Sequence, residues 1–245
     1  MSGPAERRRA RLTTQAEAAL ARLAVDPRDH GAKGSLQEAV SGLDRLLGDD
    51  DPDRARLVDE PRRTSLAAAP PPLPIRTERL VLRIREPGDL EDLLAVYGRE
   101  DVAAYLLAPA LTHDELEEML ADRDTSEEDG YGLVLDLDGR VVGEVALTFP
   151  SPTQGELSWV VHPDAGGRGL VTEAVRALLD LGFGHFALHR IYAELDPRND
   201  RSRRMCERLG MRLEAHRLAD FWSKGEWTDT QQYALLASEW DAAQH

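Results

Sequence analysis

Apolar side chains near the start of the chain recur at intervals of three and four residues, which is the spacing of one face of an α-helix. The pattern covers residues 5–25 and returns after a break at Pro27–Gly34. Its apolar positions are Leu12, Ala16, Ala19, Leu20 and Leu23, followed by Leu36, Val40, Leu43 and Leu47. We therefore predict two amphipathic helices. Because a pair this short buries little surface alone, we expect it to pack on the rest of the chain or on a second subunit.

Two stretches after this helix pair lack an apolar period. Asp49–Asp53 is almost entirely acidic, and Pro61–Pro74 is rich in proline and alanine. Both compositions are typical of solvated linkers. The pattern thus divides the chain into a helical extension over residues 1–60, a linker over 61–75 and a larger domain over 76–245.

The larger domain begins with a different period. Over Arg79–Arg85 apolar and polar residues alternate, which predicts a half-buried β-strand. Helical spacing follows over Leu90–Tyr97. Thr112 and Glu115, three residues apart, predict a capping box for another helix that runs to about Arg123.

Strands and helices alternate through the rest of the domain. Gly132–Leu137 and Val141–Phe149 flank Asp138-Gly139, which predicts a hairpin because this dipeptide tolerates the positive φ of a tight turn. The further strands expected are Glu156–Val161, Arg190–Leu195, Arg212–Leu218 and Gln231–Leu236, with a loop at Ala219–Thr230 before the last. The further helices expected are Leu170–Phe183 and Arg201–Leu209, the second ended by Gly210. This order predicts a mixed α/β domain whose helix-bearing centre lies between hairpins.

A glycine-rich segment joins the strand Glu156–Val161 to the long helix after it. Glycines in Asp164–Gly169 let backbone N–H groups approach an anion closely, and a helix N-terminus adds a favourable dipole. The segment lacks the Gly-Lys-Ser/Thr ending of a Walker A motif and the Gly-x-Gly-x-x-Gly spacing of a dinucleotide-binding fold. It therefore predicts a phosphate-binding turn of another kind.

The segment His162–Ala174 resembles the acetyl-CoA pyrophosphate loop of GNAT acetyltransferases, particularly the RimJ/RimL branch that modifies ribosomal-protein N-termini. Further blocks follow that branch's order: Arg76-Thr77-Glu78-Arg79-Leu80, Asn199–Ser202 with Glu207-Arg208-Leu209-Gly210-Met211, and Lys224-Gly225-Glu226-Trp227. The resemblance implies a GNAT fold, with a mixed, mostly antiparallel sheet that splays at the cofactor site between flanking helices. It also implies direct acetyl transfer from acetyl-CoA to a primary amine in a ternary complex, without a metal.

The same resemblance implies a set of cofactor-binding residues. Backbone amides of the loop are expected to bind the pyrophosphate, and the strand end at Val160 and Val161 to pair with the pantetheine arm. Asn199 matches a family asparagine near the thioester, and it is equally suited to cap a helix. The loop departs from the family pattern at Gly166, usually Gln or Arg, and at Val171, usually small. The full set is Val160, Val161, Gly166, Gly167, Arg168, Gly169, Leu170, Val171, Thr172, Asn199 and Ser202.

Catalysis requires a base, because a lysine-like amine with a pKa of about 10.4 has no free lone pair at neutral pH. Glu156 is our first candidate and Glu144 our second; each could instead be a strand residue facing solvent. A backbone N–H of the Val160-Val161 pair is the expected oxyanion donor. Cys206 stands where many members of the GNAT family have a tyrosine that serves as the general acid, and we expect a buried structural thiol there. Ser202 is therefore the candidate acid, unless it serves only the first helical turn.

The acceptor site is expected among aromatic side chains, in regions that wall the cleft in this fold. Tyr97, Tyr105, Trp222 and Trp227 lie there near acidic residues, although loop packing would also explain each of them. The net charge of −15 belongs entirely to residues 76–245. Such charge repels nucleic acid and anionic membrane and attracts an amine, either a small cation or a protein N-terminus.

Several further expectations concern the setting. A single cysteine, and the lack of any signal peptide or membrane-length apolar run, predict a cytoplasmic protein. No histidine spacing indicates a metal site. The sequence leaves open whether the protein is a homodimer. It also leaves two alternatives to the leading hypothesis: a non-catalytic acyl-CoA-binding module, and an aminoglycoside-type N-acetyltransferase.

Overall fold

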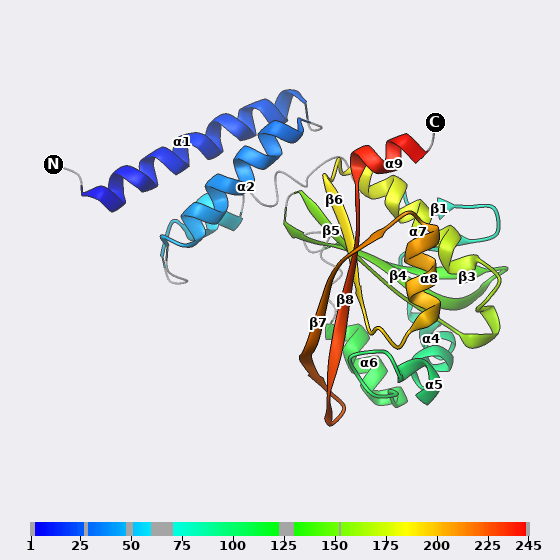
Figure 1. Ribbon diagram of the computed structural model, residues 1–245. Coiled ribbons are helices and arrows are strands. Elements are labelled where there is room, and N and C mark those ends of the chain that lie inside the picture. Colours follow the sequence, from blue (N-terminus) through cyan, green and yellow to red (C-terminus); the bar gives the residue numbers. More distant parts are fainter. Residues whose placement is uncertain are drawn as a thin grey trace.

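The computed structural model describes residues 3–26, 29–47, 51–59, 71–122, 130–151 and 153–243 (Figure 1). Several expected features fall partly outside these ranges, namely residues 49 and 50 of the acidic run, 61–70 of the linker, and the helix end near Arg123. No described helix is both long enough and apolar enough to cross a membrane.

The two predicted N-terminal helices are confirmed as α1, Pro4–Val25, and α2, His30–Asp44. They share a core of their own, completed by a π-helical turn, η1, over Ala55–Asp59. The break between the helices is shorter than predicted, because the Asp29 side chain accepts from the Ala32 N–H at 2.8 Å and so starts α2 ahead of its two glycines. The residues of this core are Leu12, Ala16, Ala19, Leu23, Ala32, Leu36, Ala39, Val40, Leu43, Leu47, Leu57 and Val58.

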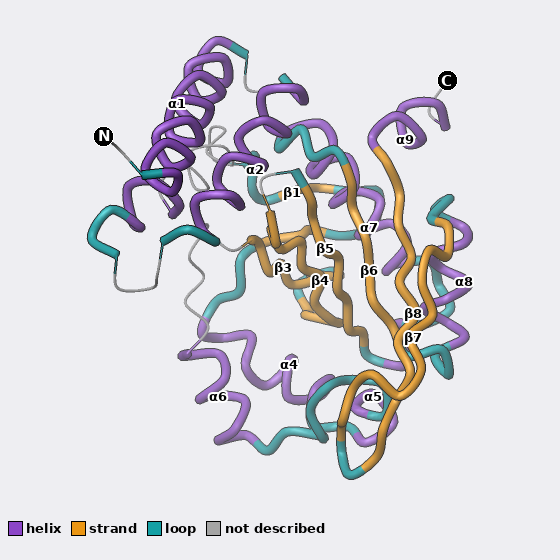
Figure 2. The backbone as a smooth tube through the Cα atoms, turned by 60° about the vertical axis from the view of Figure 1, so that its left-hand side comes forward, coloured by secondary structure: helices purple, strands orange, loops and turns teal. Residues whose placement is uncertain are grey.

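Helix α2 contacts the larger domain through polar groups. The Lys33 ammonium donates to the carbonyl oxygen of Phe186, and the Thr153 hydroxyl donates to the Gln37 side chain. Lys33 is only 2% exposed, and this burial lowers its pKa to about 8. Figure 2 shows the α1–α2 pair beside the central sheet. The expected packing of the extension on the rest of the chain is therefore observed.

An eight-stranded sheet with the order β1-β2-β3-β4-β5-β6-β8-β7 forms the centre of the larger domain. Its strands are β1 Ile75–Arg76, β2 Val81–Arg83, β3 Gly130–Leu137, β4 Arg140–Ser151, β5 Gln154–Val161, β6 Arg190–Leu195, β7 Arg212–Ser223 and β8 Glu226–Leu236. Only β5 and β6 pair in parallel, and every other neighbour is antiparallel. The predicted mixed, mostly antiparallel sheet is confirmed.

Helices cover both faces of this sheet. Helices α7 (Leu170–Asp180), α8 (Asp200–Arg208) and α9 (Ala237–Ala243) contribute to the main core, and α4 (Leu90–Tyr97) and α6 (His113–Asp122) to a second core. Successive residues of β3 separate the two layers, since Leu135 lies in the main core and Val134 in the second. The predicted capping box holds, because the Thr112 N–H donates to Glu115 at 2.8 Å.

Three predicted boundaries were wrong. The strand expected over residues 79–85 is only three residues long, and the long helix changes into a π-helical turn at Leu181–His185. The loop expected at Ala219–Thr230 is instead the end of a long hairpin, in which β7 and β8 continue to a turn at Lys224-Gly225 with φ of 49° and 86°. Near its tip the hairpin is exposed on both faces and carries the consecutive apolar residues Phe221 and Trp222, so the sequence there does not alternate. The short helix α5, Glu100–Ala103, was not predicted.

Candidate active site

The sheet forks between β5 and β6. Strand β5 pairs with β4 from Gln154 to Val161, but it pairs with β6 only from Gln154 to Glu156. Beyond the pair Glu156–Tyr192, β6 continues beside β8, and among the described residues no strand pairs with the β6 side of the β5 backbone from residue 157 to 161. The expected splay is therefore present, and Glu156 occupies its apex.

The glycine-rich segment leads from the free end of β5 into α7. A 3-10 turn, η3, over Pro163–Ala165 is followed by Gly167 and Gly169 with φ of 72° and 78°, a left-handed conformation that only glycine adopts readily. Helix α7 then begins at Leu170. The side-chain direction of Gly167 is open, with nothing within 4 Å of an added Cβ. Gly166 differs, since a Cβ there would lie 2.9 Å from the Pro163 oxygen, so the turn in this conformation has no room for a larger residue.

Residues 77–79 brace this loop from across the chain. Arg79 Nη1 donates to the carbonyl oxygen of Arg168 at 2.8 Å, and its Nε donates to Glu173 Oε2 at 2.7 Å. Thr77 Oγ1 donates to Glu173 Oε1 at 2.5 Å. Although partial burial would raise the pKa of Glu173, the hydrogen bonds from Thr77 and Arg79 outweigh it and hold the pKa below its ordinary value. The block Arg76–Leu80 and the glycine-rich block His162–Ala174 are thus in direct contact.

Glu156 is a half-buried carboxylate with one hydroxyl donor. The Tyr192 hydroxyl donates to Glu156 Oε2 at 3.2 Å. Burial raises the pKa of Glu156 above its ordinary value, the bond from Tyr192 opposes the rise, and the charge of Glu194 adds to it. A carboxylate with a raised pKa is a stronger base than an ordinary one, which suits proton abstraction.

Glu144, the second candidate base, is enclosed. It is 4% exposed, lies opposite Val160 in the β4–β5 register, and accepts from the Tyr97 hydroxyl through Oε2 at 2.7 Å. Tyr97, on α4, is half-buried, and its hydroxyl is engaged with this residue of the sheet. Of the two glutamates, Glu156 is the better placed to meet an external amine.

Helix α8 starts beside the fork. Asn199 Oδ1 accepts from the Ser202 N–H at 3.1 Å, so Asn199 caps the helix. Ser202 Oγ accepts from the Trp159 indole at 3.1 Å, a β5 contact that the sequence did not predict. Cys206 is fully buried, and burial raises its pKa to about 12. It is the inert thiol expected.

The remaining aromatic candidates gather at the tip of the β7–β8 hairpin. Trp222 and Trp227 meet edge to face, with ring centroids 5.3 Å apart, and remain 56% and 61% exposed. Lys224 Nζ donates to the carbonyl oxygens of Ala103 and Ala104, at 2.7 and 2.9 Å. The tip is thereby tied to the segment that carries Tyr105, which is 44% exposed.

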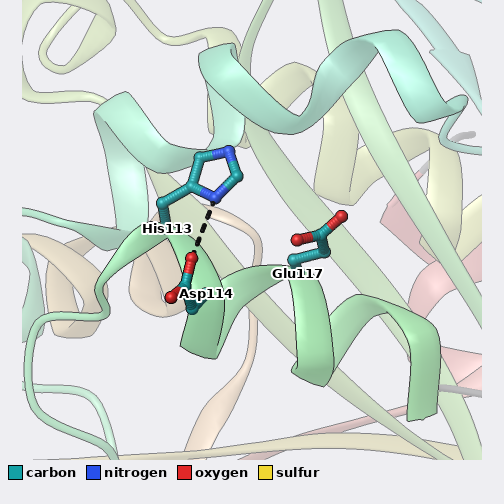
Figure 3. A group of neighbouring side chains, drawn as sticks. All are labelled: His113, Asp114 and Glu117. Carbon is teal, nitrogen blue, oxygen red and sulfur yellow. Dashed lines mark ion pairs between the residues drawn. The ribbon is translucent and has the colours of Figure 1, made fainter.

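One group of potential metal ligands occurs among the described residues. His113, Asp114 and Glu117 lie on the first turns of α6, with ligand-type atoms within 4.8 Å of one another (Figure 3). The His113 ring and Asp114 are 3.5 Å apart, and both carboxylates are exposed. Histidine spacing does not reveal this group, because its other two members are carboxylates. Exposed carboxylates beside a histidine are common on protein surfaces, and no buried ligand would fix an ion here.

Comparisons with known proteins identify the family to which this domain belongs. A family model described as the acetyltransferase (GNAT) domain matches residues 79–212. An uncharacterised N-acetyltransferase of Bacillus subtilis, YnaD, is 27% identical over 169 residues, which are 68% of this chain and 99% of that protein. Spermidine N(1)-acetyltransferase of Vibrio cholerae is 24% identical over 165 residues, which are 66% of this chain and 95% of that protein.

Among solved structures, a GNAT-family acetyltransferase of Bacillus anthracis superposes with a TM-score of 0.62 and 28% identity. The match covers 67% of this chain and 99% of that one. Each relative is thus matched along nearly its whole length, whereas the family model leaves the helical extension of this chain outside its range.

Proposed function

Because this chain belongs to the GNAT acetyltransferase family and is an acetyl-CoA-dependent N-acetyltransferase, we propose that it acetylates a small cationic amine of the polyamine type, with Glu156 as the general base. The observation that carries the proposal is the position of Glu156, a half-buried carboxylate at the apex of the fork.

The residues around the fork fit acetyl-CoA. The left-handed glycines and the start of α7 present the backbone amides of residues 167–170 to a pyrophosphate, and Thr172 adds a hydroxyl. The unpaired side of β5, ending in Val160 and Val161, offers backbone groups to an extended pantetheine arm. Val171 is half-buried against the main core, so that much of its bulk lies within the protein.

The bound co-substrate supplies a thioester carbonyl for attack by the amine. In our proposal Glu156 Oε1 takes the proton of the incoming ammonium, because Oε2 already accepts from Tyr192. A backbone N–H at the end of β5 donates to the carbonyl oxygen as charge develops there. Ser202 Oγ accepts from Trp159 and keeps its own hydrogen free for the departing sulfur.

Charge and similarity together favour a cationic acceptor. The domain carries the whole net charge of −15, and Glu194 lies close enough to Glu156 to influence its pKa. A long cation would have acidic groups at the fork and aromatic faces at the hairpin tip, Trp222 and Trp227, as binding sites. The relative named as a spermidine N(1)-acetyltransferase supports this acceptor class.

A protein N-terminus is the second candidate acceptor. The four ordered sequence blocks favour it, because they resemble those of the RimJ/RimL branch, and the exposed tryptophans offer a peptide apolar surface. Aminoglycosides form a third arm of the test as small polycationic amines.

An acceptor screen separates these classes. The full chain is incubated with acetyl-CoA and with polyamines, aminoglycosides or N-terminal peptides in turn, and each product is weighed by mass spectrometry. We expect one added acetyl group on polyamines and the fastest turnover with them. Turnover confined to peptides would replace the first candidate by the second. Stabilisation by acetyl-CoA without turnover on any amine would indicate a non-catalytic acyl-CoA-binding module.

We also propose a cytoplasmic setting and a homodimer. The single, deeply buried cysteine needs no oxidising compartment. Sedimentation of the full chain across a concentration series measures its mass directly, and a constant monomer mass would contradict the dimer.

A further inference from the structure

Tyr192 lies directly across the parallel pair from the proposed base. It is the last β6 residue in register with β5, opposite Glu156, and its hydroxyl donates to Glu156 Oε2 at 3.2 Å. Beyond this pair the strands part. The hydrogen bond therefore spans the last position at which the β6 side of the fork can hold the carboxylate.

The tyrosine ring is itself held in place. Ile191 and Ala193 point into the main core, so Arg190, Tyr192 and Glu194 lie together on the opposite face of β6. The Arg190 guanidinium lies over the Tyr192 ring, 5.6 Å from its centroid, and pairs with Glu214 at 2.7 Å.

The neighbouring strand β8 contributes a side chain that binds both Arg190 and Glu194. Gln232 accepts from Arg190 at 3.2 Å and donates to Glu194 Oε1 at 2.8 Å. Both residues that flank Tyr192 on this face are thus fixed by one β8 side chain. Tyr192 is the member of the group that reaches across to β5.

We propose that Tyr192 is a positioning residue, whose hydroxyl holds the Glu156 carboxylate in one orientation at the apex of the fork. The inference rests on the proposed role of Glu156. Among the described residues no side chain donates to Glu156 Oε1, so the bond at Oε2 leaves the other oxygen for the amine proton. Burial and the charge of Glu156 raise the Tyr192 pKa to about 12, so the hydroxyl stays a donor throughout the neutral range.

Replacing Tyr192→Phe removes only the hydroxyl, and Tyr233→Phe is the matched control. Tyr233 lies on the adjacent strand but points into the main core. With the full chain and the acceptor found in the screen, kcat/KM is measured against pH. In parallel, the Glu156 carboxyl of the ligand-free protein is titrated by carbon NMR, its signal assigned by its loss in Glu156→Gln.

Loss of the hydroxyl stabilises the protonated carboxyl relative to the carboxylate, so the Glu156 pKa rises. We expect the NMR titration and the acid limb of the rate profile to move together to higher pH, with kcat about 3- to 10-fold lower on the plateau. Acetyl-CoA affinity and the control variant remain unchanged. In a Glu156→Gln background, Tyr192→Phe should have no further effect on residual turnover.

The outcomes are distinguishable. An unmoved NMR titration with an unmoved rate profile overturns the positioning role, and so does a rate loss that persists in the Glu156→Gln background. A shifted titration with an unmoved rate profile supports the contact between Tyr192 and Glu156 but removes Glu156 as the base, which contradicts the proposed function instead.

Discussion

The cofactor end and the acceptor end of the proposed site are built in different ways. The cofactor end is one continuous segment, in which backbone amides, left-handed glycines and the first turn of α7 form the proposed pyrophosphate site. The acceptor end is assembled from side chains on β5, β6 and the β7–β8 hairpin. A backbone-built site depends on conformation, whereas a side-chain-built site depends on single functional groups. Substitutions at the cofactor end should therefore change acetyl-CoA affinity, whereas substitutions at the acceptor end should change turnover or the acceptor KM.

The largest effect is expected from Glu156→Gln at the acceptor end. Removing a general base costs about 10²- to 10⁴-fold in turnover. Acetyl-CoA affinity, measured by calorimetry, should stay unchanged, because the amide keeps the shape of the side chain. Glu38→Gln, on the exposed surface of the extension, is the control. Near-normal turnover in Glu156→Gln would move the base to another residue, with Glu144 the next to test.

Gly169→Ala tests the cofactor end. A Cβ there meets only Arg79, at 3.6 Å, so the effect is backbone strain at φ 78° rather than a clash. A left-handed alanine costs about 1–2 kcal/mol, and we expect the acetyl-CoA Kd to rise about 5- to 30-fold with acceptor KM unchanged. Gly184→Ala controls for the added methyl group, because a Cβ there has no atom within 4 Å and the residue lacks a positive φ. Unchanged affinity and stability would mean that the loop does not need its left-handed turn.

Trp227→Ala should show the opposite selectivity. If the tryptophan binds a cationic amine, its loss raises the acceptor KM about 2- to 30-fold and leaves the acetyl-CoA Kd alone. Leu218→Ala, also exposed on the hairpin, is the control for lost apolar surface. Equal changes in both variants would assign the hairpin tip a purely structural role.

The smallest effect concerns the brace behind the loop and depends on pH. Because the folded-state pKa of Glu173 is depressed, its contribution to stability is present above the unfolded pKa, near 4.5, and is lost as the pH falls through the folded pKa. Glu173→Gln should lower the free energy of unfolding by about 1 kcal/mol at pH 7, since Arg79 is partly exposed. Urea unfolding of both proteins at pH 7 and pH 4 should show a smaller difference in the free energy of unfolding at pH 4. A difference that grows toward pH 4 would contradict this.

The same contrast explains what the sequence could predict. Helix Leu90–Tyr97 and strand Arg190–Leu195 were predicted with the bounds observed, because their apolar periods are regular. The cofactor loop was recognisable because its glycines are contiguous. The hairpin tip was not, since β7 is exposed on both faces there, and its turn depends on Lys224 and Gly225 adopting positive φ together.

Contacts between distant segments also escaped prediction. Arg79 and Glu173 are separated by 94 positions, and Glu156 and Tyr192 by 36. Nothing local to either partner specifies such a pair; the strand register and the placement of α7 decide it. For this reason the sequence could nominate Glu156 but could not supply the tyrosine that holds it.

The hydrogen bonds of the two lysine side chains bear on whether the enzyme can acetylate itself. Lys33 and Lys224 are the only lysines in the chain, against 28 arginines, whose guanidinium groups do not deprotonate. Lys33 is 2% exposed and donates to the Phe186 carbonyl, and Lys224 donates to the carbonyls of Ala103 and Ala104. A catalyst that consumes primary amines thus holds both of its own lysine amines in hydrogen bonds to backbone carbonyls, and buries one of them. Self-acetylation at either lysine therefore requires that its hydrogen bonds to backbone carbonyls first break.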